Sequence, residues 1–267
     1  MFSLVVSDLD GTLLNDYHEL SDYTIQVIRR LSEEGVEFVF ATGRHYADVR
    51  KIRDQLGIDM HLITSNGART HNCHGEEITG HDIPGEYLAP LVTIGRKYMD
   101  RVMTNIYQGN DWFVEQPSEV LQAFHKTSGF SYSLQPLDTL ETGSLQKIFF
   151  MAEKHDQLSS LESEVRALFN EKLSITYSLP NCFEVMAKGV NKGKALSELL
   201  TIKSIDPSCV IAFGDGLNDV EMLSLAGKGI MMGNADQRMK DQLPGYEQIG
   251  YCNENAVAHY IKTILRI

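Results

Sequence analysis

The chain has 267 residues, of which 43% are hydrophobic, so it can bury a sizeable core in one large or two ordinary domains. Its formal net charge of -12 argues against broad binding to nucleic acid or an anionic membrane, because both need a basic face. Four widely spaced cysteines without a C-x-x-C pair argue against a zinc site or a disulfide framework and favour a reducing cytoplasm. No stretch approaches the length of a membrane span, and the first residues lack the basic region of a signal peptide.

The first apolar run of the chain ends in two aspartates. Residues 2–6 predict a buried parallel strand, and Asp8-Leu9-Asp10-Gly11-Thr12 follows it directly. Ligands bind at the carboxyl ends of strands in open α/β sheets, so we expect an active site here. The two carboxylates can bind a divalent cation together, or they can act as nucleophile and general acid/base. A solvated turn is the alternative, whereas an EF-hand loop is excluded because its sixth position lacks the required glycine.

Helices and strands alternate over residues 21–67. The apolar spacing predicts helices over 21–34 and 45–56 and buried strands over 36–41 and 61–64. The two strands end in Thr42-Gly43-Arg44 and in Ser65-Asn66-Gly67. This pattern predicts an α/β fold, a doubly wound parallel sheet with right-handed crossovers, in which all three strand ends share one edge.

The pattern changes after residue 67. A hairpin is expected over 69–78, and Pro84-Gly85 then marks the start of an inserted domain. Within the insert we expect helices over 86–99, 117–126 and 155–169, and strands over 102–107, 112–115, 130–134, 146–151, 173–178 and 182–186. Such a mixture predicts an α+β insert with antiparallel pairing. Because it leaves and re-enters the chain at one edge of the sheet, it should cover the strand ends as a cap.

The first pattern returns at Gly189. We expect helices over 192–200, 218–226 and 254–265, and strands over 209–213, 229–232 and 247–250. The predicted organisation is therefore a discontinuous core, residues 1–83 and 189–267, with residues 84–188 as the cap.

A second acidic turn lies in the returning part of the core. Asp215 and Asp219 occupy a Gly-rich turn after the strand over 209–213, and if that strand pairs beside the first, Asp215 comes to lie opposite Asp8 and Asp10. Three clustered carboxylates cannot all stay ionised and unpaired at a buried edge, and a hard cation with few carboxylate ligands would be Mg²⁺. Held alone, Asp215 could simply cap the following helix.

Further residues could bind phosphate. Thr42 and Gly43 offer a hydroxyl and backbone N–H groups at a helix entrance, Lys192 adds a positive charge, and Asn218 could donate another hydrogen bond. Taken singly, each has a structural alternative as an ordinary loop or a solvated residue. A Walker A loop and a dinucleotide-binding fingerprint are both absent, so ATP and NAD are not suggested.

Four motifs in this order resemble one known family. Over its whole length the chain resembles a phosphatase of the haloacid dehalogenase superfamily, of the Cof-type branch with a large C2-type cap. The motifs are Asp8-Leu9-Asp10-Gly11-Thr12, Thr42-Gly43-Arg44, Asn191-Lys192-Gly193 and Gly214-Asp215-Gly216-Leu217-Asn218-Asp219, and Ser65-Asn66-Gly67-Ala68 matches a further Cof-type signature.

The resemblance implies a role for each motif residue. Asp8 attacks phosphorus and forms an aspartyl-phosphate, while Asp10 protonates the departing alkoxide and later deprotonates the attacking water. Mg²⁺ is bound by the carboxylates of Asp8 and Asp215 and the backbone carbonyl of Asp10, with support from Asp219. The phosphate-binding groups implied are the N–H groups of Leu9 and Gly43 and the side chains of Thr42, Lys192 and Asn218. Substrate choice is expected from the cap and from the rim residues Arg44, His45 and Asn66.

Several alternatives stay open. The residue two positions after the nucleophile, Asp10, favours phosphoester hydrolysis of a small phosphomonoester, but a phosphosugar mutase would keep the same groups. A phosphometabolite sensor without turnover is the candidate from another class. The resemblance includes enzymes that hydrolyse sugar phosphates and enzymes that hydrolyse pyridoxal 5′-phosphate, and the residues around Arg44 and Asn66 favour the latter. Monomer and homodimer are both compatible with the sequence.

Overall fold

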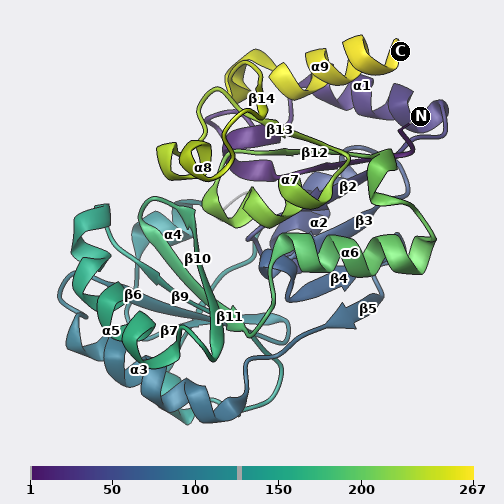
Figure 1. Cartoon of the computed structure of the whole chain (residues 1–267). Coiled ribbons are helices and arrows are strands. Elements are labelled where there is room, and N and C mark those ends of the chain that lie inside the picture. Colours follow the sequence, from purple (N-terminus) through teal and green to yellow (C-terminus); the bar gives the residue numbers. More distant parts are fainter. Residues whose placement is uncertain (1, 125–127) are drawn as a thin grey trace.

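The computed structural model of the chain describes residues 2–124 and 128–267, and within them it contains two β-sheets. Figure 1 shows the two sheets as separate bodies, with the termini of the chain beside the larger one. The larger sheet uses residues from both ends of the sequence, and the smaller one uses residues from its middle. The predicted α/β fold with an inserted cap is confirmed.

The described strands of the larger sheet follow the order β14-β13-β12-β1-β2-β3-β4-β5. Pairing is parallel from β14 to β3, and the hairpin β4–β5 continues the sheet antiparallel. Strand β12 pairs directly with β1, with Ser7 opposite Phe213, which is the pairing on which the expected approach of Asp215 to Asp8 depended. The strands are β1 (Leu4–Ser7), β2 (Glu37–Ala41), β3 (His61–Thr64), β4 (Arg69–His71), β5 (Glu77–Gly80), β12 (Val210–Gly214), β13 (Lys228–Met231) and β14 (Glu247–Gln248).

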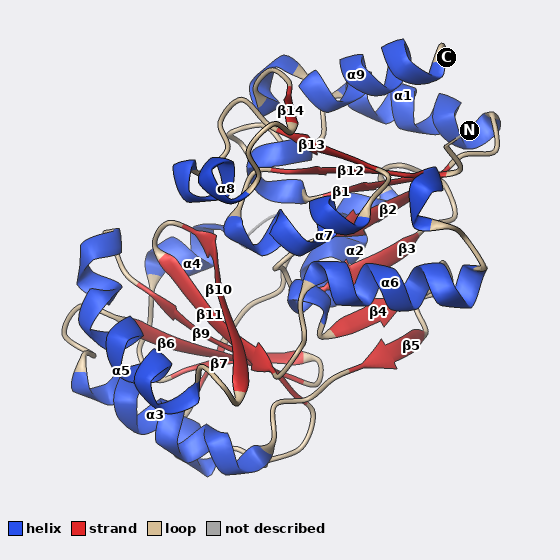
Figure 2. Ribbon diagram, in the orientation of Figure 1, coloured by secondary structure: helices blue, strands red, loops and turns tan. Residues whose placement is uncertain are grey.

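Helices cover both faces of this sheet, as Figure 2 shows. One face packs against α1 (Asp22–Glu33), α2 (Tyr46–Asp54) and α9 (Ala256–Leu265), and the other against α6 (Lys192–Lys203), α7 (Val220–Leu225) and α8 (Gln237–Gln242). Successive strand residues point to opposite faces, so Val5 joins the first cluster and Leu4 and Val6 join the second. Each such buried aliphatic side chain contributes about 1.5–3 kcal/mol, which fixes the strands and therefore their ends.

The smaller sheet has the order β10-β11-β9-β6-β7-β8 and is antiparallel except between β7 and β8. Its strands are β6 (Met103–Gln108), β7 (Asp111–Val114), β8 (Ser133–Leu134), β9 (Leu145–Met151), β10 (Leu173–Leu179) and β11 (Cys182–Ala187). Helices α3 (Leu88–Lys97) and α5 (Ser159–Phe169) pack on one face and bury residues such as Ile148 and Phe150. In Figure 2 these helices lie on the side away from the larger sheet.

Three local expectations differ from the structure. The strand expected over 130–134 is reduced to Ser133–Leu134, because Phe130 turns inward and stacks on His45 with ring centroids 4.6 Å apart. Helix α8 was not expected, since it has six mostly polar residues and buries only Met239. The helix expected over 117–126 corresponds to α4 (Glu119–Phe124), and its last expected residues lie outside the described ones.

In the described part of the chain, every helix is too short or too polar to cross a membrane.

Candidate active site

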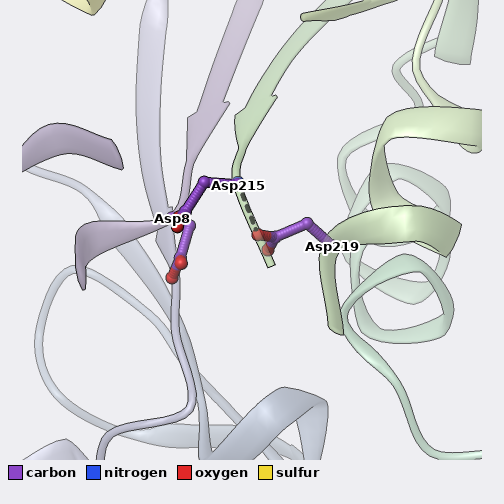
Figure 3. Close-up of side chains that lie close together, drawn as sticks. All are labelled: Asp8, Asp215 and Asp219. Atoms are coloured by element: carbon purple, nitrogen blue, oxygen red, sulfur yellow. Dashed lines mark hydrogen bonds between the residues drawn. The ribbon is translucent and has the colours of Figure 1, made fainter. Parts of the chain in front are cut away.

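Three carboxylates meet at the carboxyl ends of two neighbouring strands. Asp8 follows β1 and Asp215 follows β12, and Asp219 enters from the turn before α7. One oxygen from each of the three lies within 4.8 Å of the others. Figure 3 shows Asp8 and Asp215 side by side, with the Asp219 carboxylate turned toward Asp215. The predicted approach of Asp215 to Asp8 is therefore present, and it depends on the parallel pairing of β1 with β12.

The local backbone holds these carboxylates in place. Gly11 has a φ of 75° and packs so closely on Asp215 that a Cβ would overlap its Oδ2, so only glycine is tolerated. The Thr12 hydroxyl donates to Asp215 Oδ1 at 2.7 Å. Asp219 Oδ2 accepts the backbone N–H groups of Asp215 and Gly216 at 3.0 and 2.9 Å. The spacing of the Gly-rich turn thus serves to orient its two acids.

Lys192 is the cation at the centre of this cluster. It is fully buried at the first turn of α6, and its Nζ lies 2.8 Å from Asp8 Oδ1 and 2.7 Å from Asp219 Oδ1. Burial, with repulsion from Asp219 and Asp215, raises the pKa of Asp8 well above its usual value despite Lys192. Burial and the Asp219 charge likewise raise the pKa of Asp215 to about 7.

The cluster therefore has more negative charge than Lys192 can compensate. Hard oxygen ligands that converge in this way match the donor set of a divalent cation such as Mg²⁺. Asp8, Asp215 and Asp219 are thus the residues that could hold a metal ion.

Asp10 has different partners from Asp8. The Arg44 guanidinium binds it through two hydrogen bonds, Nε to Oδ2 at 2.7 Å and Nη2 to Oδ1 at 2.5 Å, and His18 Nδ1 lies 2.9 Å from Oδ1. Burial alone would raise the pKa of Asp10, but the Arg44 charge and these hydrogen bonds hold it well below its usual range. In this arrangement the Asp10 carboxyl is ionised. It can donate a proton only after its contact with Arg44 is broken.

The expected phosphate-binding residues lie around the same strand ends. Thr42 is buried directly after β2, and its Oγ1 accepts the Arg44 N–H at 3.1 Å. Asn218 Nδ2 donates to Asn66 Oδ1 at 2.9 Å, and Asn218 Oδ1 has no hydrogen-bond partner among the described residues. The side chain of Leu9 is fully buried in the core, so only its backbone is left to face a ligand.

A cavity of about 240 Å³ opens between the strand ends of the larger sheet and the inner face of the smaller one. Its lining includes the expected residues Asp8, Asp10, Thr42, Gly43, Arg44 and Asn218. Lys192 and Asn66 instead line a neighbouring cavity of about 140 Å³, which Asn218 also borders. The structure therefore gathers these sequence-predicted residues into one region. Asn218 lines both cavities and so lies between them.

Comparison with known proteins identifies the family. A family model described as haloacid dehalogenase-like hydrolase matches residues 5–261. The chain belongs to this family. A Haemophilus influenzae protein provisionally named as a phosphatase is 39% identical over 268 residues, covering 98% of this chain and 96% of that protein. The HMP-PP phosphatase of Serratia proteamaculans is 37% identical over 268 residues, covering 100% of this chain and 96% of that protein.

A solved structure shows the same architecture. The haloacid dehalogenase-like hydrolase from B. subtilis superposes with a TM-score of 0.86 at 26% identity, covering 98% of this chain and 99% of that one. The Cof-type resemblance predicted from the motifs is confirmed, and the chain is a phosphatase of the haloacid dehalogenase-like family with an inserted cap.

The cap of this family member contributes residues that the sequence analysis did not select. Tyr107, Trp112, Lys147, Phe149 and Glu184 line the cavity from the cap sheet. Cross-strand pairing of Tyr107 with Trp112 and Lys147, and of Glu184 with Phe149, places all five on one face. The available signal was a lone charged residue within each of two mostly apolar strands, because lysine and glutamate are rarely buried without a specific partner.

Proposed function

We propose that the chain is a Mg²⁺-dependent phosphatase that hydrolyses small phosphomonoesters through an aspartyl-phosphate on Asp8. The observation that carries this proposal is the approach of Asp8, Asp215 and Asp219 within 4.8 Å of one another, with the buried Lys192 in contact with Asp8 and Asp219. A structural ion pair would need one carboxylate for one lysine, whereas three carboxylates around a single ammonium leave negative charge uncompensated. Such a cluster at strand ends supports a metal and phosphate site.

Asp8 is the proposed nucleophile. One of its oxygens bonds to phosphorus, the ester P–O bond breaks, and the departing alkoxide takes a proton from Asp10. Water then attacks the phosphoenzyme and gives its proton back to Asp10, which restores both residues and releases inorganic phosphate. Because Arg44 keeps Asp10 ionised, the first step requires Asp10 to leave Arg44 and become protonated when substrate enters.

The surrounding groups have binding roles in this proposal. The carboxylates of Asp8 and Asp215 and the Asp10 carbonyl would hold Mg²⁺, with Asp219 in support, and the bound ion neutralises repulsion between nucleophile and phosphate. The phosphoryl oxygens would be held by the N–H groups of Leu9 and Gly43 and by the side chains of Thr42, Lys192 and Asn218.

We further propose that the leaving group is an aromatic heterocycle of the pyridoxal 5′-phosphate kind rather than a hexose. An apolar cavity of roughly 150 Å³ holds benzene, so about 240 Å³ is suited to one substituted six-membered ring. Tyr107, Trp112 and Phe149 offer aromatic contacts, and the Trp112 Nε1–H already donates to Asn105 Oδ1 at 3.0 Å. The several hydroxyls of a hexose would therefore meet few partners on this wall, and burying them unpaired is costly.

The test is release of phosphate from a generic aryl phosphate with and without Mg²⁺, using the wild-type chain and Asp8→Asn. Asparagine keeps the shape of Asp8 but is a much poorer nucleophile, so we expect a rate loss of at least about 10⁴-fold. Equal rates for the two proteins would exclude Asp8 as the nucleophile. A phosphoenzyme that persists in water until a sugar phosphate is added would indicate a mutase instead.

The substrate is tested with a panel ranked by kcat/KM. Pyridoxal 5′-phosphate, hexose phosphates and HMP-PP belong in it, the last because curated relatives are named for its hydrolysis. We expect pyridoxal 5′-phosphate to exceed the hexose phosphates. No preference between these two would refute the narrower substrate proposal and leave the phosphatase proposal intact.

A further inference from the structure

The cap carries one buried ammonium that the phosphate chemistry does not use. Lys147 lies on β9 with 2% of its surface exposed, and it lines the 240 Å³ cavity beside the phosphate-binding loop. Its Nζ donates to the Gly43 carbonyl oxygen at 2.7 Å and to Glu184 Oε1 at 2.6 Å. The ammonium also lies 4.9 Å from the centre of the Tyr107 ring and 4.6 Å from that of Phe149. Lys147 therefore stands where the aromatic wall meets the core.

Lys147 has one N–H donor left, whereas both oxygens of its partner Glu184 already accept hydrogen bonds from the protein. An ammonium has three N–H donors, and within residues 2–124 and 128–267 the structure gives Lys147 two acceptors. Both oxygens of Glu184 are engaged, Oε1 by Lys147 and Oε2 by the Asn66 amide. A ligand in the cavity can thus take one hydrogen bond from Lys147 in addition to the two that Lys147 makes to Gly43 and Glu184.

The contacts of Glu184 fix where that remaining donor lies. Asn66 binds Glu184 with its Nδ2 and accepts from Asn218 with its Oδ1, so one chain of buried hydrogen bonds runs from the cap to the phosphate site. At the other end Lys147 is bonded to Gly43, the residue after Thr42. The ammonium is therefore held close to the phosphate-binding groups, in the lining of the cavity that would receive the leaving group of a bound ester.

We propose that Lys147 is a specificity-determining residue, whose ammonium donates a hydrogen bond to an acceptor atom on the heteroaromatic ring of the leaving group. Glu184 is the positioning residue that holds Lys147 through its Oε1. The proposal rests on the proposed phosphatase function and adds the chemistry that selects the substrate: a flat ring bearing an anionic or carbonyl oxygen. A ring without such an oxygen leaves a buried donor unpaired and is rejected.

Two substrates with the same phosphorylated arm test this contact, and Lys147→Met separates it from the other differences between their rings. Pyridoxine 5′-phosphate carries the ring oxygen and has no aldehyde that would react with lysines, and benzyl phosphate has the same phosphorylated arm on a bare ring. For the wild-type chain we expect kcat/KM to be at least about 30-fold higher with pyridoxine 5′-phosphate. In Lys147→Met this ratio should fall to within about threefold of one. A ratio that stays at the wild-type value would overturn the proposal.

Three further variants accompany Lys147→Met, and the first two guard against misfolding. Lys147→Met leaves Glu184 as an unpaired buried charge, so the double variant Lys147→Met/Glu184→Gln, which buries no net charge, is measured alongside it. The control is Lys97→Met, because Lys97 forms an exposed ion pair with Glu164 on the cap, and it should keep the wild-type ratio.

Glu184→Gln alone should raise KM for pyridoxine 5′-phosphate more than it lowers kcat. An equal effect of Glu184→Gln on both substrates would assign Glu184 a merely structural role.

Binding without turnover separates this proposal from the phosphatase proposal. Trp112 is the one tryptophan of the sequence and lines the cavity, so its fluorescence reports ligand binding directly. With EDTA present, pyridoxine 5′-phosphate should quench Trp112, and Lys147→Met should weaken the Kd by at least about 30-fold. This result would support the role of Lys147 even if Asp8-dependent hydrolysis failed. Equal Kd values in wild type and variant would overturn it even in an active enzyme.

Discussion

The core and the cap contribute opposite chemistry to one cavity. On the core side, three carboxylates cluster beside one lysine, which contacts two of them, so charge is left for an added cation to neutralise. On the cap side, the single ion pair of Lys147 with Glu184 is matched and is set among aromatic rings. The difference indicates a division of labour. The unbalanced charge of the core favours phosphate transfer in general, and the balanced cap wall discriminates between leaving groups.

The largest expected effect comes from removing an acid from the core side. In Asp215→Asn the shape and the hydrogen bond from Thr12 can be kept, but one carboxylate ligand is lost. We expect kcat/KM to fall by at least about 10³-fold, or ~4 kcal/mol, and the Mg²⁺ concentration for half-maximal activity to rise. Asp241→Asn, at an exposed position on α8, is the control. An Asp215→Asn enzyme with unchanged Mg²⁺ dependence would contradict a metal role for Asp215.

The next effect concerns stability on the same side. Lys192→Met removes the only cation in contact with Asp8 and Asp219 among the described residues. Breaking a buried ion pair from one side costs about 3 kcal/mol or more, so the urea midpoint should fall clearly. Lys194→Met is the matched control, two residues along α6, where an exposed lysine pairs with Glu198 and about 1 kcal/mol or less is expected. Equal midpoints for the two variants would show that Lys192 does not hold the cluster together.

A smaller effect tests the junction between core and cap. His45 caps α2 and its Nε2 lies 3.0 Å from the cap carbonyl of Gly109, and burial lowers its pKa to about 4 from 6.5. Between these pH values the unfolded chain binds the proton and the folded chain does not. The stability due to neutral His45 is therefore full above pH 6.5 and is lost as the pH falls toward 4.

Urea unfolding at pH 7 and pH 5 measures this contribution. We expect His45 to account for about 2 kcal/mol of the stability lost between the two pH values. Burial lowers the pKa of His71 to about 4 as well, so wild type will lose more than this. In His45→Asn the pH-dependent loss should shrink by that amount, whatever the variant's stability at pH 7. An unchanged loss would show that His45 is not held neutral.

The two sides also differ in how far the sequence predicted them. Asp8 and Asp215 were expected together on the condition that the strand over 209–213 pairs beside the first strand, because parallel neighbours end at the same edge, and β12 does pair with β1. Asp219 was expected at the site because it lies on the same Gly-rich turn as Asp215, and Lys192 because it lies at the start of a predicted helix. Lys147 and Glu184 were missed because their meeting depends on the pairing of β9 with β11, and the pattern of one strand does not give its register with another.

The sequence also did not predict which residue binds the Asp10 carboxylate. Arg44 was expected at the rim for substrate choice, but in the structure it binds Asp10 through two hydrogen bonds. A long arginine side chain can reach several carboxylates, and only the packed structure shows that Arg44 binds Asp10 and, at 3.2 Å, Asp48 as well. The contraction of the strand expected over 130–134 has a similar cause, since stacking of Phe130 on His45 is a tertiary contact.

The most direct test of the central claim is to stop the reaction of a good substrate with acid within its first turnover and locate the phosphoryl group by peptide mass. A phosphoryl group on the peptide that contains Asp8, removed by hydroxylamine and absent in Asp8→Asn, is the result that a carboxylate nucleophile at this metal cluster predicts. Steady hydrolysis with no phosphorylated Asp8 peptide at any time, or with the phosphoryl group on another residue, would contradict it.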